Sequence, residues 1–145
     1  LATISEFLGR IDFVAVSGRA GVVSRAVSAD IAKCEKQFSC AMDDDFNTPQ
    51  AMGILFAFIN GHGASVWKLS RAEAVAIRNF LLKKFSLFGL VFKGSAVTAS
   101  VRALLRKREI ARISKDFVAS DAVRKEIEVM GYMVEDTPIG PYASS

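Results

Sequence analysis

The chain has few of the residues from which proteins build metal sites and nucleophiles. Its 145 residues include one histidine, His62, and two cysteines, Cys34 and Cys40. On one helix the two thiols would lie about 240° apart around the axis, so they can neither form a disulfide there nor share a zinc ion. We expect two buried free thiols, no metal site and a reducing, cytoplasmic setting. His62 lies among glycines at residues 60–63, where we expect an exposed loop histidine without a function.

Long apolar runs are also missing, which excludes a membrane-spanning helix. The longest run, residues 54–59, is far shorter than the roughly 20 residues that a bilayer requires. Residues 1–16 lack the basic region of a signal peptide. The chain is nevertheless 51% hydrophobic, with a mean hydropathy of +0.29. This content suffices for a core, and it suits a piece that was cut from a partner domain. We expect no membrane association and a monomer.

Apolar residues recur every three or four positions, which predicts an all-α fold. The expected helices cover residues 3–16, 24–42, 48–59, 70–88, 97–117 and 120–130. A strand at residues 132–134 and a turn at 137–140 predict a small hairpin. The composition changes from apolar to charged across residues 90–95. We therefore expect an antiparallel bundle of about four helices at residues 1–93, followed by a small helix-helix-hairpin module at residues 94–145.

Two helix starts carry capping residues. Ser70 and Glu73 have the spacing of a capping box, in which each side chain binds the backbone N–H of the other residue. Asn47 or Thr48 can cap the next helix upstream, because Pro49 then occupies its first turn, where the missing N–H costs nothing.

The run Asp43-Asp44-Asp45 presents three successive carboxylates. Consecutive side chains point in different directions, and the sequence nearby offers no further acids to complete the oxygen shell of a magnesium ion. Negative charge before a helix N-terminus is stabilising by roughly 0.3–1 kcal/mol per group. We therefore interpret the three acids as an electrostatic cap for the helix that follows, with a magnesium site as the alternative.

Basic residues concentrate near the C-terminus, although the net charge of +4 is modest. Residues 102–115 contain six basic side chains and one acid. Arg108, Arg112 and Lys115 recur at helical spacing and share a face that leads to Phe117. Such a face suits a single-stranded RNA loop, whose bases can stack on an aromatic ring. The alternatives are a solvated face without a ligand and a core position for Phe117. The expected core face of this helix comprises Val101, Leu104, Leu105, Ile113 and Phe117.

Two phrases of the sequence resemble the end of the cysteinyl-tRNA synthetases. A-M-D-D-D-F-N-T-P-Q-A at residues 41–51 resembles their helical-bundle (DALR) domain, which follows the catalytic core. K-D-F at residues 115–117, V-E-D-T-P at 134–138 and Gly140 resemble the region in which the anticodon is read. The phrases stand in family order, and the resemblance covers roughly residues 25–142. It implies recognition of cysteine tRNA within an enzyme that ligates cysteine to this tRNA at the expense of ATP.

The resemblance also implies which residues contact the tRNA. It assigns Arg112 to base edges or phosphate, Phe117 to stacking, and the carboxylates of Asp121 and Asp136 to accepting hydrogen bonds from bases. The candidate tRNA-binding residues are Arg108, Arg112, Lys115, Phe117, Asp121 and Asp136. We expect these residues to converge on one surface.

The nucleotide-binding signatures of this enzyme class, H-x-G-H and a K-M-S-K-S-like loop, do not occur in the sequence, and neither do the zinc-ligand cysteines. We therefore expect a C-terminal fragment with no catalytic residue and no cofactor of its own. The resemblance assigns ATP and zinc to the catalytic domain of the parent chain, which would be a partner alongside cysteine tRNA. Two alternatives remain open. One is the bundle of a cysteine:glucosaminyl-inositol ligase of the mycothiol pathway, and the other is a non-enzymatic helical protein-interaction module.

Overall fold

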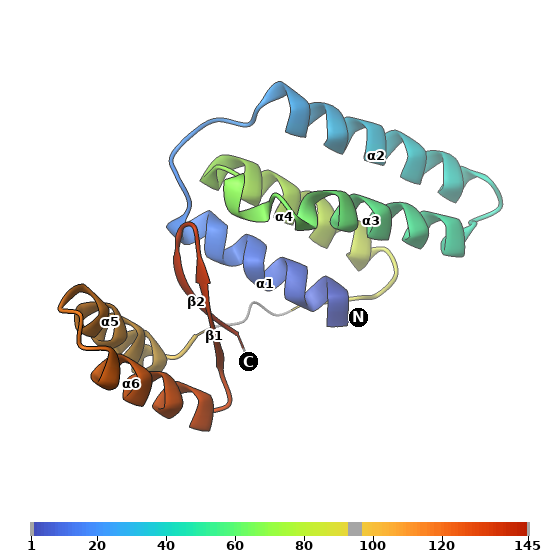
Figure 1. The fold of residues 1–145 in the computed structure, drawn as a ribbon. Coiled ribbons are helices and arrows are strands. Elements are labelled where there is room, and N and C mark those ends of the chain that lie inside the picture. The colour runs from blue at the N-terminus through green and yellow to red at the C-terminus, as the bar shows by residue number, and fades with distance from the viewer. Residues whose placement is uncertain (1, 93–96, 145) are drawn as a thin grey trace. The chain divides into compact units, whose positions relative to one another are not determined.

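The structure, a computed structural model, describes residues 2–92 and 97–144 and confirms the mostly helical fold (Figure 1). The elements of the described residues are α1 (Ala2–Ser17), α2 (Arg25–Asp43), α3 (Thr48–Gly63), η1 (Val66–Lys68), α4 (Arg71–Ser86), α5 (Ala99–Ile113), α6 (Phe117–Val129), β1 (Met133–Thr137) and β2 (Gly140–Ser144). The chain divides into two compact units, Leu1–Gly94 and Ser95–Ser145. The predicted linker at residues 90–95 lies partly outside the described residues. Within the described ranges, none of the helices has the length and apolar character needed to cross a membrane.

The first unit is a four-helix bundle in which α1 packs against α4 and α2 lies beside α3 (Figure 1). Its core contains large apolar side chains that are fully buried, among them Ile11, Leu55, Ile77 and Phe85. These residues recur at helical spacing in the sequence, so each helix turns one apolar face toward the others.

Hydrogen bonds at the helix ends join the elements of the bundle. The predicted capping box is confirmed: Ser70 Oγ accepts from the Glu73 backbone N–H, and Glu73 Oε1 accepts from that of Ser70, both at 3.2 Å. Ser24 caps α2 and also donates its hydroxyl to Glu73 Oε2 at 3.1 Å, which ties the starts of α2 and α4 together. At the start of α3 the cap is Asn47, whose Oδ1 accepts from the Gln50 N–H at 3.2 Å.

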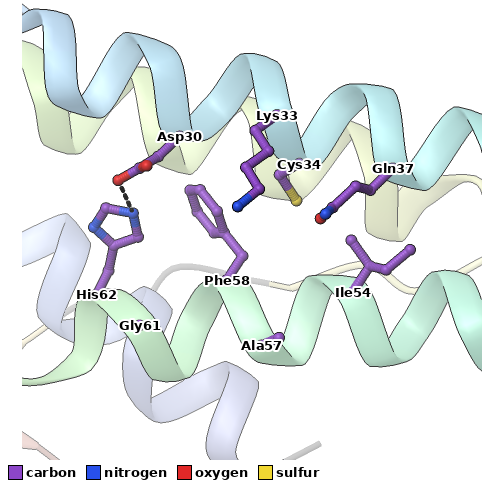
Figure 2. A pocket seen from close by; sticks show the side chains of 9 residues that line it. All are labelled: Asp30, Lys33, Cys34, Gln37, Ile54, Ala57, Phe58, Gly61 and His62. Carbon is purple, nitrogen blue, oxygen red and sulfur yellow. Dashed lines mark ion pairs between the residues drawn. The ribbon is translucent and has the colours of Figure 1, made fainter.

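The predicted end of α3 at residues 60–63 is wrong, because the helix continues through the glycines to Gly63. His62 is therefore a helix residue, and its side chain is only 12% exposed. Its ring lies 4.6 Å from that of Phe58, and its Nε2 is 3.6 Å from Asp30 Oδ2 on α2 (Figure 2). A helical glycine costs roughly 1 kcal/mol relative to alanine, so the helix continues here despite an unfavourable local propensity.

The expected burial of both thiols needs correction. Cys34 is buried as expected, but Cys40 is exposed, because the two thiols lie on different sides of α2. Burial, reinforced by the charge of Glu35, raises the pKa of the Cys34 thiol to about 11.

The three aspartates precede α3 as expected, but the residue that caps it by a hydrogen bond is Asn47, and the electrostatic interpretation stays a prediction. Asp43 ends α2 and Asp44 is its C-cap, whereas the first turn of α3 contains no acid. Asp45 and Phe46 have positive φ values of 50° and 52°, so the chain reverses tightly here before Asn47 caps α3. In the described residues, no group of three or more His, Cys, Asp and Glu side chains is placed to hold a metal ion.

The second unit packs α5 against α6 and adds an antiparallel hairpin in which Val134 faces Ala143. Its core is a cluster of aliphatic side chains: Val101, Val123, Ile127, Val134 and Ala143. The predicted hairpin is present, but α5 ends and α6 begins at other residues than predicted.

The helix expected at residues 97–117 ends at Ile113, and α6 begins at Phe117 rather than near residue 120. Lys115 adopts a left-handed conformation with φ 59°, and Asp116 caps α6 by accepting from the Ala119 N–H at 3.2 Å. As a consequence, Ile113 and Phe117 are 81% and 62% exposed, so their expected core positions are wrong.

Candidate nucleic-acid interface

A groove of the second unit lies where the end of α5 and the start of α6 meet the hairpin. Its volume is about 410 Å³. Its lining residues are Glu109, Arg112, Ile113, Phe117, Asp136, Thr137, Gly140 and Pro141. Three of the candidate tRNA-binding residues, Arg112, Phe117 and Asp136, therefore line one groove although they belong to α5, α6 and β1.

Asp136 is the centre of an ionic network in this groove. Arg108 Nη1 donates to Asp136 Oδ1 at 2.9 Å, and Arg108 Nη2 donates to Oδ2 at 3.0 Å, which makes a two-pronged pair. Arg112 Nη1 donates to the same Oδ1 at 2.8 Å. Glu109 accepts from Arg108 Nη1 at 3.2 Å, so a second acid balances the two guanidinium groups. The network ties β1 to α5.

These contacts fix the charge state of the groove at neutral pH. The hydrogen bonds from Arg108 hold the pKa of Asp136 below its ordinary value, and the charge of Arg112 acts in the same direction. The hydrogen bond to Asp136 raises the pKa of Arg108 despite its burial, and the charge of Asp121 adds to this effect. Asp136 is therefore an ionised carboxylate, able only to accept hydrogen bonds, beside two permanent cations.

Arg108 does not lie on the expected solvent-facing basic face. It is only 4% exposed, because the hairpin covers this side of α5 and Asp136 meets the guanidinium there. Arg112 remains exposed one helical turn later. Helical spacing correctly predicts that the two arginines share a side of α5, but it cannot show that a strand far along the chain covers one of them.

Lys115 and Asp121 are exposed but are not among the residues that line the groove. Lys115 follows the end of α5 with a left-handed backbone, so it does not extend the helical face of Arg112. Asp121 lies on α6, near enough to Arg108 for its charge to act there. The structure adds Glu109 and Ile113 to the groove. No sequence signal singled out Glu109, and the apolar periodicity assigned Ile113 to the core.

A second hollow, of about 260 Å³, lies in the first unit between α2 and α3 (Figure 2). The His62–Asp30 pair spans the two helices at one end of it, Lys33 of α2 lies beside Phe58 of α3, and Gln37 lies opposite Ile54 at the other end. None of the candidate tRNA-binding residues lies here.

Comparisons with known proteins bear on both units. Residues 37–93 match the DALR domain family, and residues 95–140 match the cysteinyl-tRNA ligase anticodon binding domain. The chain is 30% identical to the cysteine–tRNA ligase of Streptococcus equi subsp. zooepidemicus, over 81% of this chain and 25% of that protein. It is 31% identical to the enzyme of Lactiplantibacillus plantarum, over 79% of this chain and 26% of that protein.

A third relative shows a higher identity over a shorter part of this chain. The chain is 36% identical to the cysteine–tRNA ligase of Shewanella woodyi, over 72% of this chain and 25% of that protein. The chain thus spans about a quarter of the length of the curated relatives it matches. The matched segments contain both sequence phrases on which the resemblance rested.

Proposed function

We propose that this chain, which belongs to the cysteinyl-tRNA synthetase family, binds cysteine tRNA and reads its anticodon through the groove of the second unit. One observation carries the proposal: Arg112, Phe117 and Asp136 line the same groove although they come from three different elements. The match of residues 95–140 to an anticodon-binding domain supports this reading over the two alternatives.

The three side chains offer what an unpaired base requires. The exposed ring of Phe117 provides a stacking surface, and base–aromatic stacking is worth roughly 1–3 kcal/mol per base. Asp136 is an ionised acceptor for amino or imino groups of a base. Arg112 can donate to a base edge or to a phosphate, because its guanidinium is partly exposed beside Asp136.

The remaining candidates fit around this groove. Asp121 supplies a second exposed acceptor, Lys115 can contact the phosphate backbone, and Arg108 takes part through Asp136. Phosphate contacts contribute affinity without selecting a sequence, whereas contacts to base edges distinguish one anticodon from another.

The parent enzyme, by the same proposal, ligates cysteine to its tRNA in the cytoplasm. ATP and zinc belong to its catalytic domain, which is a partner of this chain together with cysteine tRNA. The bundle of the first unit connects that domain to the anticodon reader, and this chain contributes tRNA recognition without catalysing a step. We propose that it acts as a monomer.

Binding measurements across a salt series test the proposal. We expect the chain to prefer cysteine tRNA to the same tRNA with a substituted anticodon, and Arg112→Ala or Asp121→Ala to reduce this preference by about 1–3 kcal/mol. The matched control is Arg106→Ala, an exposed position on α5 outside the groove lining. It should weaken both tRNAs alike and flatten the salt dependence. Equal binding of the two tRNAs by the unmodified chain would overturn the proposal.

A further inference from the structure

Arg108 is an unusual member of the basic segment because its charge is buried. Its side chain is 5% exposed, whereas the side chain of Arg112 is 40% exposed. A buried guanidinium loses its hydration, so it persists only where hydrogen bonds to an acid replace the water. Both of its terminal nitrogens donate to Asp136, while its buried Nε has no hydrogen-bond partner. The guanidinium is thus oriented toward Asp136, although this orientation leaves its Nε without a hydrogen bond.

This arrangement leaves Asp136 a restricted capacity to accept hydrogen bonds. An ionised carboxylate has about four lone-pair sites. Arg108 takes one on each oxygen, and Arg112 takes a second on Oδ1. The site that remains is on Oδ2, and the Asp136 side chain is 50% exposed within the groove. The carboxylate therefore presents an acceptor of fixed position and orientation.

Resting on the proposed function, we propose that Arg108 is a positioning residue for anticodon recognition, which clamps Asp136 so that its free Oδ2 lone pair meets a donor group of one base. Arg108 does not contact the RNA, because it lies beneath Asp136 and is buried. A clamped carboxylate can reject a base that offers an acceptor at that point, whereas a mobile one could turn away from it. Arg108 thereby affects the choice of tRNA rather than the overall affinity.

The clamp requires an arginine rather than only a positive charge. A guanidinium is a planar fork that matches both carboxylate oxygens, whereas an ammonium group is a compact point charge. Arg108→Lys therefore keeps the charge and removes the fork. Arg106→Lys is the matched control, because it makes the same change at an exposed position of the same helix.

The experiment uses the full 145-residue chain with two readouts. The first is binding to cysteine tRNA and to an anticodon-substituted version. We expect Arg108→Lys to lower the ratio of the two affinities about tenfold while binding of the substituted tRNA changes less than twofold; Arg106→Lys should leave the ratio unchanged. The second readout needs no RNA: a carbon-13 NMR titration of Asp136, whose pKa should rise in Arg108→Lys and stay unchanged in Arg106→Lys.

The outcomes separate this proposal from the one on which it rests. If the unmodified chain does not distinguish the two tRNAs, the proposed function fails, and the role of Arg108 in recognition fails with it. If the unmodified chain discriminates and Arg108→Lys discriminates equally well, only the positioning role is overturned. An equal loss of binding to both tRNAs also overturns it, because it indicates a general structural role. If amide spectra show that Arg108→Lys does not fold, Arg108→Gln repeats both measurements with a neutral donor.

Discussion

The two units of this chain bury their side chains in different ways. The bundle encloses large residues such as Ile77, Leu81 and Phe85, which are entirely inaccessible. The core cluster of the second unit consists of three valines, one isoleucine and one alanine, and the unit leaves several large apolar side chains in solvent. Those more than 60% exposed in the second unit are Ile110, Ile113, Phe117, Val118, Val129 and Met133. Among its described residues, the first unit has five such side chains, Val16, Val22, Phe46, Leu87 and Val91, in a longer segment of the chain. The second unit therefore exposes more large apolar side chains for its length.

Each unit also contains an ion pair with a buried cation. In the bundle, Lys84 donates to Glu35 at 2.7 Å and lies 5.1 Å from the ring of Phe38, so the ammonium group is largely enclosed by its partners. In the second unit, the Arg108–Asp136 pair buries the cation and leaves the acid half exposed. The acid is about half exposed in both pairs, at 47% for Glu35 and 50% for Asp136. The difference lies in their surroundings: Asp136 lines the groove of the second unit, whereas Glu35 is not among the residues that line the hollow between α2 and α3.

Phenylalanine-to-alanine changes in the two units give the largest expected contrast. Phe85→Ala should destabilise the bundle by about 3–5 kcal/mol, because it opens a cavity at a fully buried site. Phe117→Ala should change the free energy of unfolding by less than about 0.5 kcal/mol, yet weaken tRNA binding by roughly 1–3 kcal/mol through lost stacking. Urea unfolding and filter binding measure the two effects.

The contrast between these phenylalanines can also be refuted. A loss of several kcal/mol in Phe117→Ala would show that its ring supports the core of the second unit. Unchanged tRNA binding by a stable Phe117→Ala chain would instead remove the ring from the recognition surface. Phe46→Ala is the control, because Phe46 is also exposed but belongs to the first unit. It shows the effect on stability of replacing an exposed phenylalanine with alanine.

A smaller effect is expected at the cap of α3. Asn47→Ala should cost about 1 kcal/mol, because Oδ1 of Asn47 accepts the Gln50 N–H. Thr48→Ala should cost less than about 0.5 kcal/mol, since Thr48 already belongs to the helix and its side chain is exposed. The denaturant midpoints of the two single variants show which residue caps α3. A larger loss of stability in Thr48→Ala than in Asn47→Ala would identify Thr48 as the cap.

The smallest expected effect is the response of the second unit to acid. The folded pKa of Asp136 is lower than its unfolded value of about 3.9. The pair therefore stabilises the unit above that pH, and this contribution is lost as the pH falls toward the folded pKa. Because the carboxylate is half exposed, the loss should be under about 1 kcal/mol.

Amide signals of the second unit, followed in urea between pH 5 and pH 2.5, measure this loss. The expected decrease is absent from Asp136→Asn, which has no proton to gain in this range. A decrease of the same size in Asp136→Asn would assign the acid response to other carboxylates.

Local sequence patterns predicted those features that depend on neighbouring residues. The capping box of Ser70 and Glu73 was identifiable because both partners lie within one helical turn. The buried face of α2, including Val27, Cys34 and Phe38, follows directly from the 3/4 spacing of its apolar residues. The hairpin was also expected, although its strands extend further than residues 132–134.

Expectations that depended on distant partners were less accurate. The glycines around His62 indicated a loop, but contacts with Phe58 and Asp30 accompany a helix that continues to Gly63. Apolar spacing assigned Ile113 and Phe117 to a core, but both side chains are exposed. Periodicity assumes one continuous helix, and it cannot detect that the left-handed backbone of Lys115 separates the two residues into different helices.

The sequence by itself determined the helical pattern, the main caps and the two family phrases, because each is written in residues close together in the chain. Only the tertiary structure decided that Arg108 is buried, that Arg112 is not, and that both hold Asp136 from 24 to 28 residues away. The physical reason is that burial and pairing of a charge depend on which element covers it. In this protein the covering element is a hairpin. Its Asp136 accepts hydrogen bonds from Arg108, so this arginine of the basic helix holds a carboxylate in place.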